Sequence, residues 1–200
     1  GWALVSDTKS GCPAPDVTIF NRGLKRAYTE CDQWRRNVLT SITSMKPTLV
    51  IAAGTRTESL VDRGTGQLID PAKAGTQWQE GWSRTLHVLS TAGVPVVVLR
   101  DTPWPGKDMA SCVAQNMSDP RSCDVTRAAL DKPTYDIGMT RGVPLAHGVD
   151  LSDVICDADV CPATRGRYLV YRDTNHLTAT FARALEPYLA KQLIPLVQAR

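Results

Sequence analysis

The sequence has no apolar run of the length that a transmembrane helix needs. The longest uninterrupted apolar stretch is Val94–Leu99, far short of the roughly 20 residues that span a bilayer. No cationic start followed by an apolar core is found at Gly1, so these residues include no signal peptide. If the protein is exported, we expect its export signal to lie upstream of this sequence.

The sequence also lacks a strong excess of charge of either sign. It contains 23 Lys and Arg residues against 20 Asp and Glu residues, for a net charge of +3. An excess this small and this scattered argues against a nucleic acid as the partner. Hydrophobic residues make up 42% and charged residues 22% of the chain, which is ordinary for a soluble globular protein. The length of 200 residues fits one domain with a substantial core.

The six cysteines include no C-x-x-C pair, and the three histidines do not cluster with them, which argues against a zinc site. Six cysteines allow about 15 pairings, and free thiols are the other alternative. Short loops are the least costly to close, so we favour disulfides between neighbours. The favoured pairs are Cys12 with Cys31, Cys112 with Cys123, and Cys156 with Cys161. Disulfides indicate an oxidising compartment.

Hydrophobic periodicity predicts strands that alternate with helices. The expected strands are 2–6, 48–53, 94–100, 142–150 and 167–171; the expected helices are 29–46, 76–91, two short ones within 107–132, and 177–197. The continuous apolar runs at 48–53 and 94–100 are typical of strands buried on both faces. We expect the last helix to bend or break at Pro187 and Pro195. This alternation predicts an α/β fold with a mainly parallel sheet covered by helices on both faces.

The strongest local signal for chemistry is an aspartate three residues before a histidine, Asp173 and His176, after a predicted strand and before a helix. A carboxylate at this spacing can accept a hydrogen bond from His Nδ1, fix the tautomer and leave Nε2 as a base for a serine hydroxyl. The alternative is that Asp173 caps the last helix and His176 is an ordinary first-turn residue. Spacing alone does not separate the two interpretations.

The other two histidines give weaker signals. His87 lies in a predicted helix that carries two tryptophans, where a structural or exposed role is expected. His147 lies in a loop-like segment, where either contact with a ligand or packing of the loop would fit.

Four segments occur in an order that resembles the SGNH-hydrolase domain at the C-terminus of acyltransferase-3 membrane proteins. They are 8–13 (TKSGCP), 49–54 (LVIAAG), 101–103 (DTP) and 173–178 (DTNHLT). The resemblance extends over nearly the whole chain. It implies a single domain over residues 1–200 with a three-layer α/β/α sandwich of the SGNH, flavodoxin-like type. It also implies a position outside the cytoplasm, in the periplasm or at the outer face of the cytoplasmic membrane, tethered through an upstream membrane domain.

Within this resemblance, Asp173 and His176 match the catalytic D-x-x-H block of the family. Gly54 matches the end of the strand that helps to form the oxyanion hole, and Thr55 and Arg56 follow in the adjacent loop. The wider SGNH pattern places an Asn two residues after that glycine, where this chain has Arg56. An arginine there can donate to an oxyanion or a sugar hydroxyl, or it can serve in a salt bridge.

The larger departure is the nucleophile, which the family carries in a G-D-S-H block on the first strand. No Gly-Asp-Ser occurs in the 200 residues. In a doubly wound sheet the first strand is usually central, so a chain without it should expose an unpaired hydrophobic strand edge. We therefore expect the nucleophile block and its strand to lie upstream of these residues.

The resemblance implies a serine-dependent O-acyltransferase, transferring O-acetyl groups to a glycan or glycolipid of the cell envelope. The acyl donor would arrive through a fused transmembrane acyltransferase domain, and the mechanism needs no metal and no organic cofactor. A secreted carbohydrate esterase or lipase would use the same residues with water as the acceptor. A non-catalytic glycan-binding module is the third alternative, in which Asp173 and His176 do not meet.

Overall fold

The computed structural model of the protein describes residues 3–54, 59–130 and 136–198. The chain forms two compact units. Unit 1 consists of Gly1–Arg100 and Thr134–Gly148, and unit 2 consists of Asp101–Pro133 and Val149–Arg200. Within the described residues, no helix has both the length and the apolar character needed to cross a membrane.

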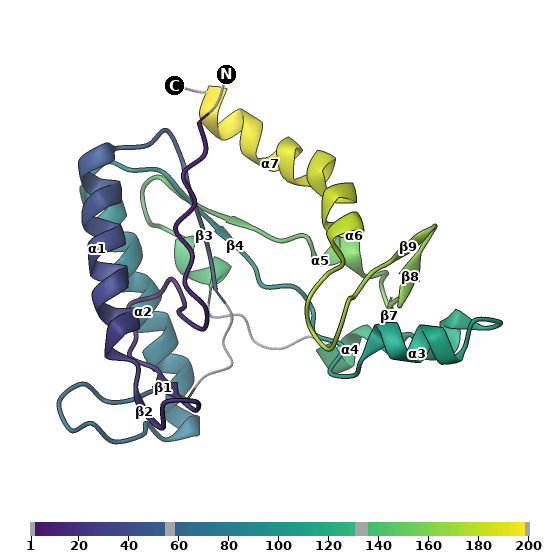
Figure 1. Cartoon of the computed structure of the whole chain (residues 1–200). Coiled ribbons are helices and arrows are strands. Elements are labelled where there is room, and N and C mark those ends of the chain that lie inside the picture. The colour runs from purple at the N-terminus through teal and green to yellow at the C-terminus, as the bar shows by residue number, and fades with distance from the viewer. Residues whose placement is uncertain (1–2, 55–58, 131–135, 199–200) are drawn as a thin grey trace. The chain divides into compact units, whose positions relative to one another are not determined.

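Unit 1 is built on a three-stranded sheet with two long helices (Figure 1). The strand order is β3-β4-β6, and β3 and β4 run parallel with Val50 opposite Val96. The elements of this unit are β1 (Phe20–Asn21), β2 (Arg26–Ala27), α1 (Thr29–Met45), β3 (Val50–Ala53), α2 (Pro71–Thr91), β4 (Val96–Leu99), η2 (Ile137–Thr140) and β6 (Ala146–Val149). The parallel sheet with its helices confirms the predicted α/β class.

One face of the sheet carries the core of unit 1. Apolar side chains of α1 and α2 pack together against alternate residues of β3 and β4, because side chains along a strand point alternately to the two faces. The cluster is formed by Trp82, Leu86, Leu89, Val94, Val96 and Val98, with Leu39, Ile42, Val50 and Ala52 at its margin. Helix α2 begins where the sequence places a cap and a proline: Asp70 accepts a hydrogen bond from the amide of Ala72, and Pro71 is its first residue.

Two details of the predicted sheet are wrong. Residues 3–6 form no strand, because no other strand in the described part of the chain pairs with them. Strand β3 is not buried on both faces: it lies at an edge of the sheet, and Ile51 is 48% exposed. Strand β4, between β3 and β6, does have both faces buried, as expected.

Unit 2 consists of short elements around a core of its own. They are α3 (Met109–Gln115), η1 (Pro120–Cys123), β5 (Val125–Thr126), α4 (Arg127–Leu130), α5 (Ser152–Ile155), β7 (Val160–Cys161), β8 (Thr164–Arg165), β9 (Tyr168–Leu169), α6 (Ala179–Ala184) and α7 (Glu186–Gln198). Strands β5 and β7 pair antiparallel, as do β8 and β9. The largest fully buried side chain is Tyr171, which packs with Met109, Ile155 and Phe181.

The closing helix is broken, but the break does not fall at a proline. Helix α6 ends at Ala184 and α7 begins at Glu186, so Pro187 lies in the first turn of α7, where a missing amide proton costs nothing. Pro195 lies within α7.

All six cysteines are in disulfides, and the pairs are the local ones that the sequence favours. Cys12 is bonded to Cys31, Cys112 to Cys123, and Cys156 to Cys161. The second disulfide joins the two short helices α3 and η1, as the spacing predicts.

Candidate active site

The segment 172–176 forms a tight loop between two paired residues of unit 2. Tyr171 and Leu177 make an antiparallel bridge, and the amide of Arg172 donates to the carbonyl of His176 at 2.8 Å. Tyr171 is fully buried and Leu177 packs against the same core. The loop is therefore held at its base by backbone pairing and apolar packing, and its tip carries the polar residues.

Two further contacts fix the ends of this loop. Thr178 caps α6: its hydroxyl accepts from the amide of Phe181 at 3.2 Å and donates to the carbonyl of Leu169 at 2.6 Å. At the tip, the amide of Gly106 donates to the carbonyl of Thr174 at 3.1 Å. Because Thr178 is the cap and α6 begins at Ala179, Asp173 does not cap the last helix and His176 does not lie in its first turn.

The loop brings Asp173 and His176 into contact. Nδ1 of His176 lies 2.8 Å from Oδ2 and 3.0 Å from Oδ1 of Asp173. An ionised carboxylate only accepts hydrogen bonds, so Nδ1 carries the proton in this pair. That arrangement leaves Nε2 as the basic nitrogen of the neutral ring. The His176 side chain is 60% exposed, and within the described residues no hydrogen bond reaches Nε2.

The backbone keeps Asp173 ionised. The amide of His176 donates to Oδ1 at 2.8 Å and the amide of Asn175 at 3.0 Å, and Nε of Arg172 donates to Oδ2 at 3.2 Å. The amides of His176 and Asn175, followed by the side chains of His176 and Arg172, outweigh desolvation and hold the pKa of Asp173 well below its usual value. The carboxylate is thus charged and oriented toward the imidazole at any pH near neutrality.

Gly54 follows β3 in unit 1, whereas Asp173 and His176 belong to unit 2. A Cβ atom on Gly54 would lie 3.2 Å from the amide nitrogen of Ala14 and 3.4 Å from Cα of Pro13. The backbone of segment 13–14 therefore passes close to Gly54. This close approach accounts for a glycine at position 54 independently of any catalytic role. Thr55 and Arg56 lie outside the described residues.

The remaining histidines lie on the surface of unit 1. His87 on α2 and His147 on β6 are both exposed. In the described part of the chain, no group of three or more His, Cys, Asp or Glu side chains is arranged to hold a metal ion.

Two residues that hold the Asp173 loop in place, Arg172 and Gly106, were not predicted from the sequence. Arg172 is adjacent to Asp173 and could have been noticed as a donor, but nothing in the sequence links Gly106 to Thr174 across the intervening residues. Pairings of this kind depend on how the chain folds back on itself.

Comparisons with known proteins identify the family and the fold of the chain. The profile of the family described as SGNH domain (fused to AT3 domains) matches residues 1–191. A solved structure, the periplasmic domain of a lipopolysaccharide acetyltransferase from Salmonella ser. Paratyphi A, is similar in fold, with a TM-score of 0.59 and 15% sequence identity. The similarity covers 90% of this chain and 69% of that one. No curated protein sequence matches. Because the family profile covers nearly its whole length, the chain belongs to the family of SGNH domains that are fused to AT3 domains.

Proposed function

We propose that the protein transfers an O-acyl group, such as O-acetyl, to a carbohydrate of the cell envelope, with His176 as the general base and Asp173 as its orienting carboxylate. The observation that carries the proposal is the contact of 2.8 Å between Nδ1 of His176 and Asp173, on a side chain that is 60% exposed. A histidine held in this way can take the proton from a serine hydroxyl and later exchange it with the leaving or accepting hydroxyl. Backbone amides near the serine and Gly54 would bind the tetrahedral oxyanion, and Thr55 and Arg56 would line the same region.

Among the described residues no strand pairs with the outer edge of β3, which supports a strand contributed from outside the 200 residues. Ile51 on this strand is 48% exposed. In the flavodoxin-like order 2-1-3 the first strand lies between the second and the third. A strand that carries the nucleophile and pairs with β3 would complete the sheet and help to cover Ile51. That residues 1–200 together with this strand form one SGNH-like domain is part of the proposal.

The location and the partners follow from the same reasoning. The three disulfides fit an oxidising compartment, and the family is fused to AT3 domains. An extracytoplasmic position, with the acyl donor supplied through a fused membrane domain and a glycan or glycolipid as the acceptor, fits both observations.

The proposal is tested by His176→Ala in the native host, with the O-acetyl content of the envelope glycan measured by NMR. Loss of the base should reduce acetylation at least about a thousandfold. Asp173→Asn should come close to the same loss, because an amide donor opposite Nδ1 selects the wrong tautomer. His147→Ala is the matched control, since it removes another exposed histidine, and it should leave acetylation unchanged.

Two outcomes would contradict the proposal. Unchanged acetylation in His176→Ala would favour a non-catalytic glycan-binding module. Labelling with a fluorophosphonate should modify a serine outside residues 1–200, and a labelled serine within them would overturn the assignment of the nucleophile to another segment.

A further inference from the structure

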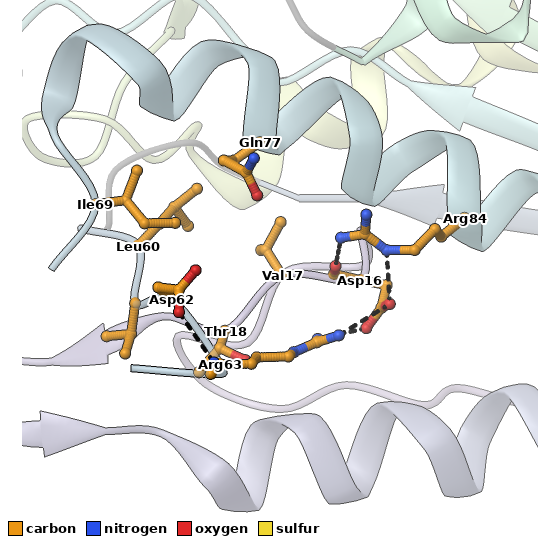
Figure 2. Close-up of a pocket in the computed structure, with 11 residues that line it drawn as sticks. Asp16, Val17, Thr18, Leu60, Asp62, Arg63, Ile69, Gln77 and Arg84 are labelled. Atoms are coloured by element: carbon orange, nitrogen blue, oxygen red, sulfur yellow. Dashed lines mark hydrogen bonds and ion pairs between the residues drawn. The ribbon is translucent and has the colours of Figure 1, made fainter. Parts of the chain in front are cut away.

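Unit 1 contains a pocket of about 280 Å³ that includes neither Asp173 nor His176. It lies between the segment 16–18, the loop 60–64 and helix α2 (Figure 2). The residues that line it are Asp16, Val17, Thr18, Leu60, Val61, Asp62, Arg63, Gly64, Ile69, Gln77 and Arg84. No residue of this pocket is part of the dyad described above, and no sequence motif pointed to it.

One wall of the pocket is organised by the carboxylate of Asp16. Arg63 donates to both of its oxygens, at 2.5 and 3.2 Å, and Nε of Arg84 donates to Oδ2 at 3.0 Å. A second nitrogen of Arg84 donates to the carbonyl of Asp16 at 2.6 Å. Partial burial opposes ionisation of Asp16, but the hydrogen bonds and charges of Arg63 and Arg84 prevail and lower its pKa to about 2.

A buried layer behind this wall holds it in place. Arg35, whose side chain is 4% exposed, lies 3.2 Å from Asp32 and 3.5 Å from Asp16. The hydroxyl of Thr18 donates to Asp32 at 2.6 Å and accepts from Nε of Arg63 at 2.7 Å. The side chains that face the pocket are therefore fixed before any ligand binds, which reduces the entropy cost of binding.

The charges around the pocket balance. Among the lining residues, Arg63 and Arg84 are offset by Asp16 and Asp62, and Arg35 behind them is offset by Asp32. Glu80, which is half exposed, also lies 4.0 Å from Arg84, so an anionic ligand would find no uncompensated positive charge here. The residues that line the pocket fit a neutral ligand that both donates and accepts hydrogen bonds.

Hydrogen-bonding groups and an apolar surface face the same space. Asp62 uses Oδ1 for the turn that follows it, accepting from the amides of Gly64 and Thr65 at 3.0 and 2.7 Å, and Figure 2 shows its other oxygen turned toward the pocket. Gln77 donates from Nε2 to Glu80 at 3.0 Å, and its amide oxygen points to the pocket side of α2 (Figure 2). The apolar part of the lining is formed by Ile69, which is partly exposed, in front of the buried Val17 and Leu60.

We propose that this pocket binds one neutral pyranose unit of a glycan. A sugar ring has an apolar face for Ile69, and hydroxyl groups that both donate to carboxylate and amide oxygens and accept from guanidinium N–H groups. A pocket of about 280 Å³ lies just below the usual range for ligand sites, about 300–1,000 Å³, and so it suits a single ring. The inference rests on the proposed function only for the choice of a glycan as the source of the sugar.

The test is a titration of the ¹⁵N-labelled protein with methyl glycosides of glucose, galactose and mannose, followed by NMR. At least one glycoside should bind in the millimolar range and shift the amides of Gly64 and Thr65 and the Nε–H of Arg84. Gln77→Ala should weaken this binding about fivefold, the effect of one lost hydrogen bond. Gln79→Ala is the matched control, because Gln79 is exposed on the same helix and does not line the pocket.

Further arms of the titration make each result decisive. Arg84→Met, which leaves the Arg63–Asp16 pair in place, should also weaken binding. Glucuronate or inorganic phosphate binding more tightly at the same amides would overturn the assignment to a neutral sugar, and no shift with any glycoside would overturn the site. His176→Ala should leave the glycoside shifts unchanged, so failure of this site and failure of the proposed catalytic role are read out separately.

Discussion

The two polar clusters of this protein are assembled in opposite ways. The Asp173–His176 pair is made within one loop, from residues three positions apart, with the backbone amides of the loop as the main partners of the carboxylate. The cluster around Asp16 joins side chains from four separate segments, and Arg84 lies 68 residues from its partner. The first cluster depends on local backbone geometry, and the second depends on packing of the whole unit. Substitutions should therefore affect stability very differently in the two regions.

The largest effect is expected for Asp32→Ala in the assembled cluster. This substitution removes a carboxylate 3.2 Å from Arg35, whose side chain is 4% exposed, and also removes the acceptor of the Thr18 hydroxyl. The free energy of unfolding in urea should fall by about 3 kcal/mol, because the buried guanidinium loses the nearer of its two carboxylate partners and keeps only Asp16 at 3.5 Å. Asp153→Ala is the control: Asp153 pairs with Arg127 but is 87% exposed, and the loss should stay below about 1 kcal/mol.

The double variant Asp32→Ala/Arg35→Met sharpens this test. Removal of both charges should restore part of the stability lost in Asp32→Ala, since the cost comes from a buried guanidinium that has lost its nearer carboxylate. If the double variant has a lower free energy of unfolding than Asp32→Ala, the loss of the ion pair does not explain the effect of Asp32→Ala.

An intermediate effect, dependent on pH, is expected for Asp16→Asn. The pKa of Asp16 is lowered from 3.8 to about 2, so its ionised form stabilises the fold by about 2 kcal/mol at neutral pH. A carboxyl group with a lowered pKa contributes fully above the unfolded value, and the contribution disappears as the pH falls through the folded value. The difference in unfolding free energy between wild type and Asp16→Asn should therefore shrink between about pH 5 and pH 2. Parallel curves over that range would show that Asp16 does not depend on Arg63 and Arg84 in this way.

The smallest effect is expected for Thr178→Ala in the local region. Loss of the cap on α6 should lower the unfolding free energy by about 1 kcal/mol. Thr178 also fixes the base of the Asp173 loop, through its hydrogen bond to the carbonyl of Leu169. Thr180→Ala, two positions further along α6, removes an exposed hydroxyl that lies 3.2 Å from that of Thr178 but does not itself cap the helix, and it should change the unfolding free energy by less than about 0.5 kcal/mol. A loss in Thr178→Ala as large as that in Asp32→Ala would remove the proposed difference between the regions.

The same contrast explains what the sequence predicted well. Helix 29–46 and the buried strand near Val94 follow from periodicity over a few residues, and the structure has both. The spacing of Asp173 and His176 allows the contact that the structure has, but the same spacing also allowed a helix cap. The local disulfides belong to the same group. These features are formed by residues that are close together in the sequence, so the local pattern of residue types is enough to predict them.

What the sequence could not show depends on distant segments. The apolar run at 48–53 predicts a strand but does not tell that β3 lies at a sheet edge, with Ile51 exposed. Nothing near Asp16 in sequence indicates that Arg63 and Arg84 converge on it. Charged residues at such positions look like ordinary surface residues until the fold places them side by side.

Helix α2 approaches the segment 16–17 so closely at Gly81 that a Cβ there would lie 2.5 Å from a methyl carbon of Val17. The amide of Asp16 donates to the carbonyl of Gly81 at 3.1 Å, so helix α2 and the segment 16–17 are in contact at the residue that carries the Asp16 carboxylate. A single hydrogen atom in place of a side chain thus sets how far apart the helix and the loop stand. Gly81 therefore sets the width of the adjacent pocket, although it does not line it.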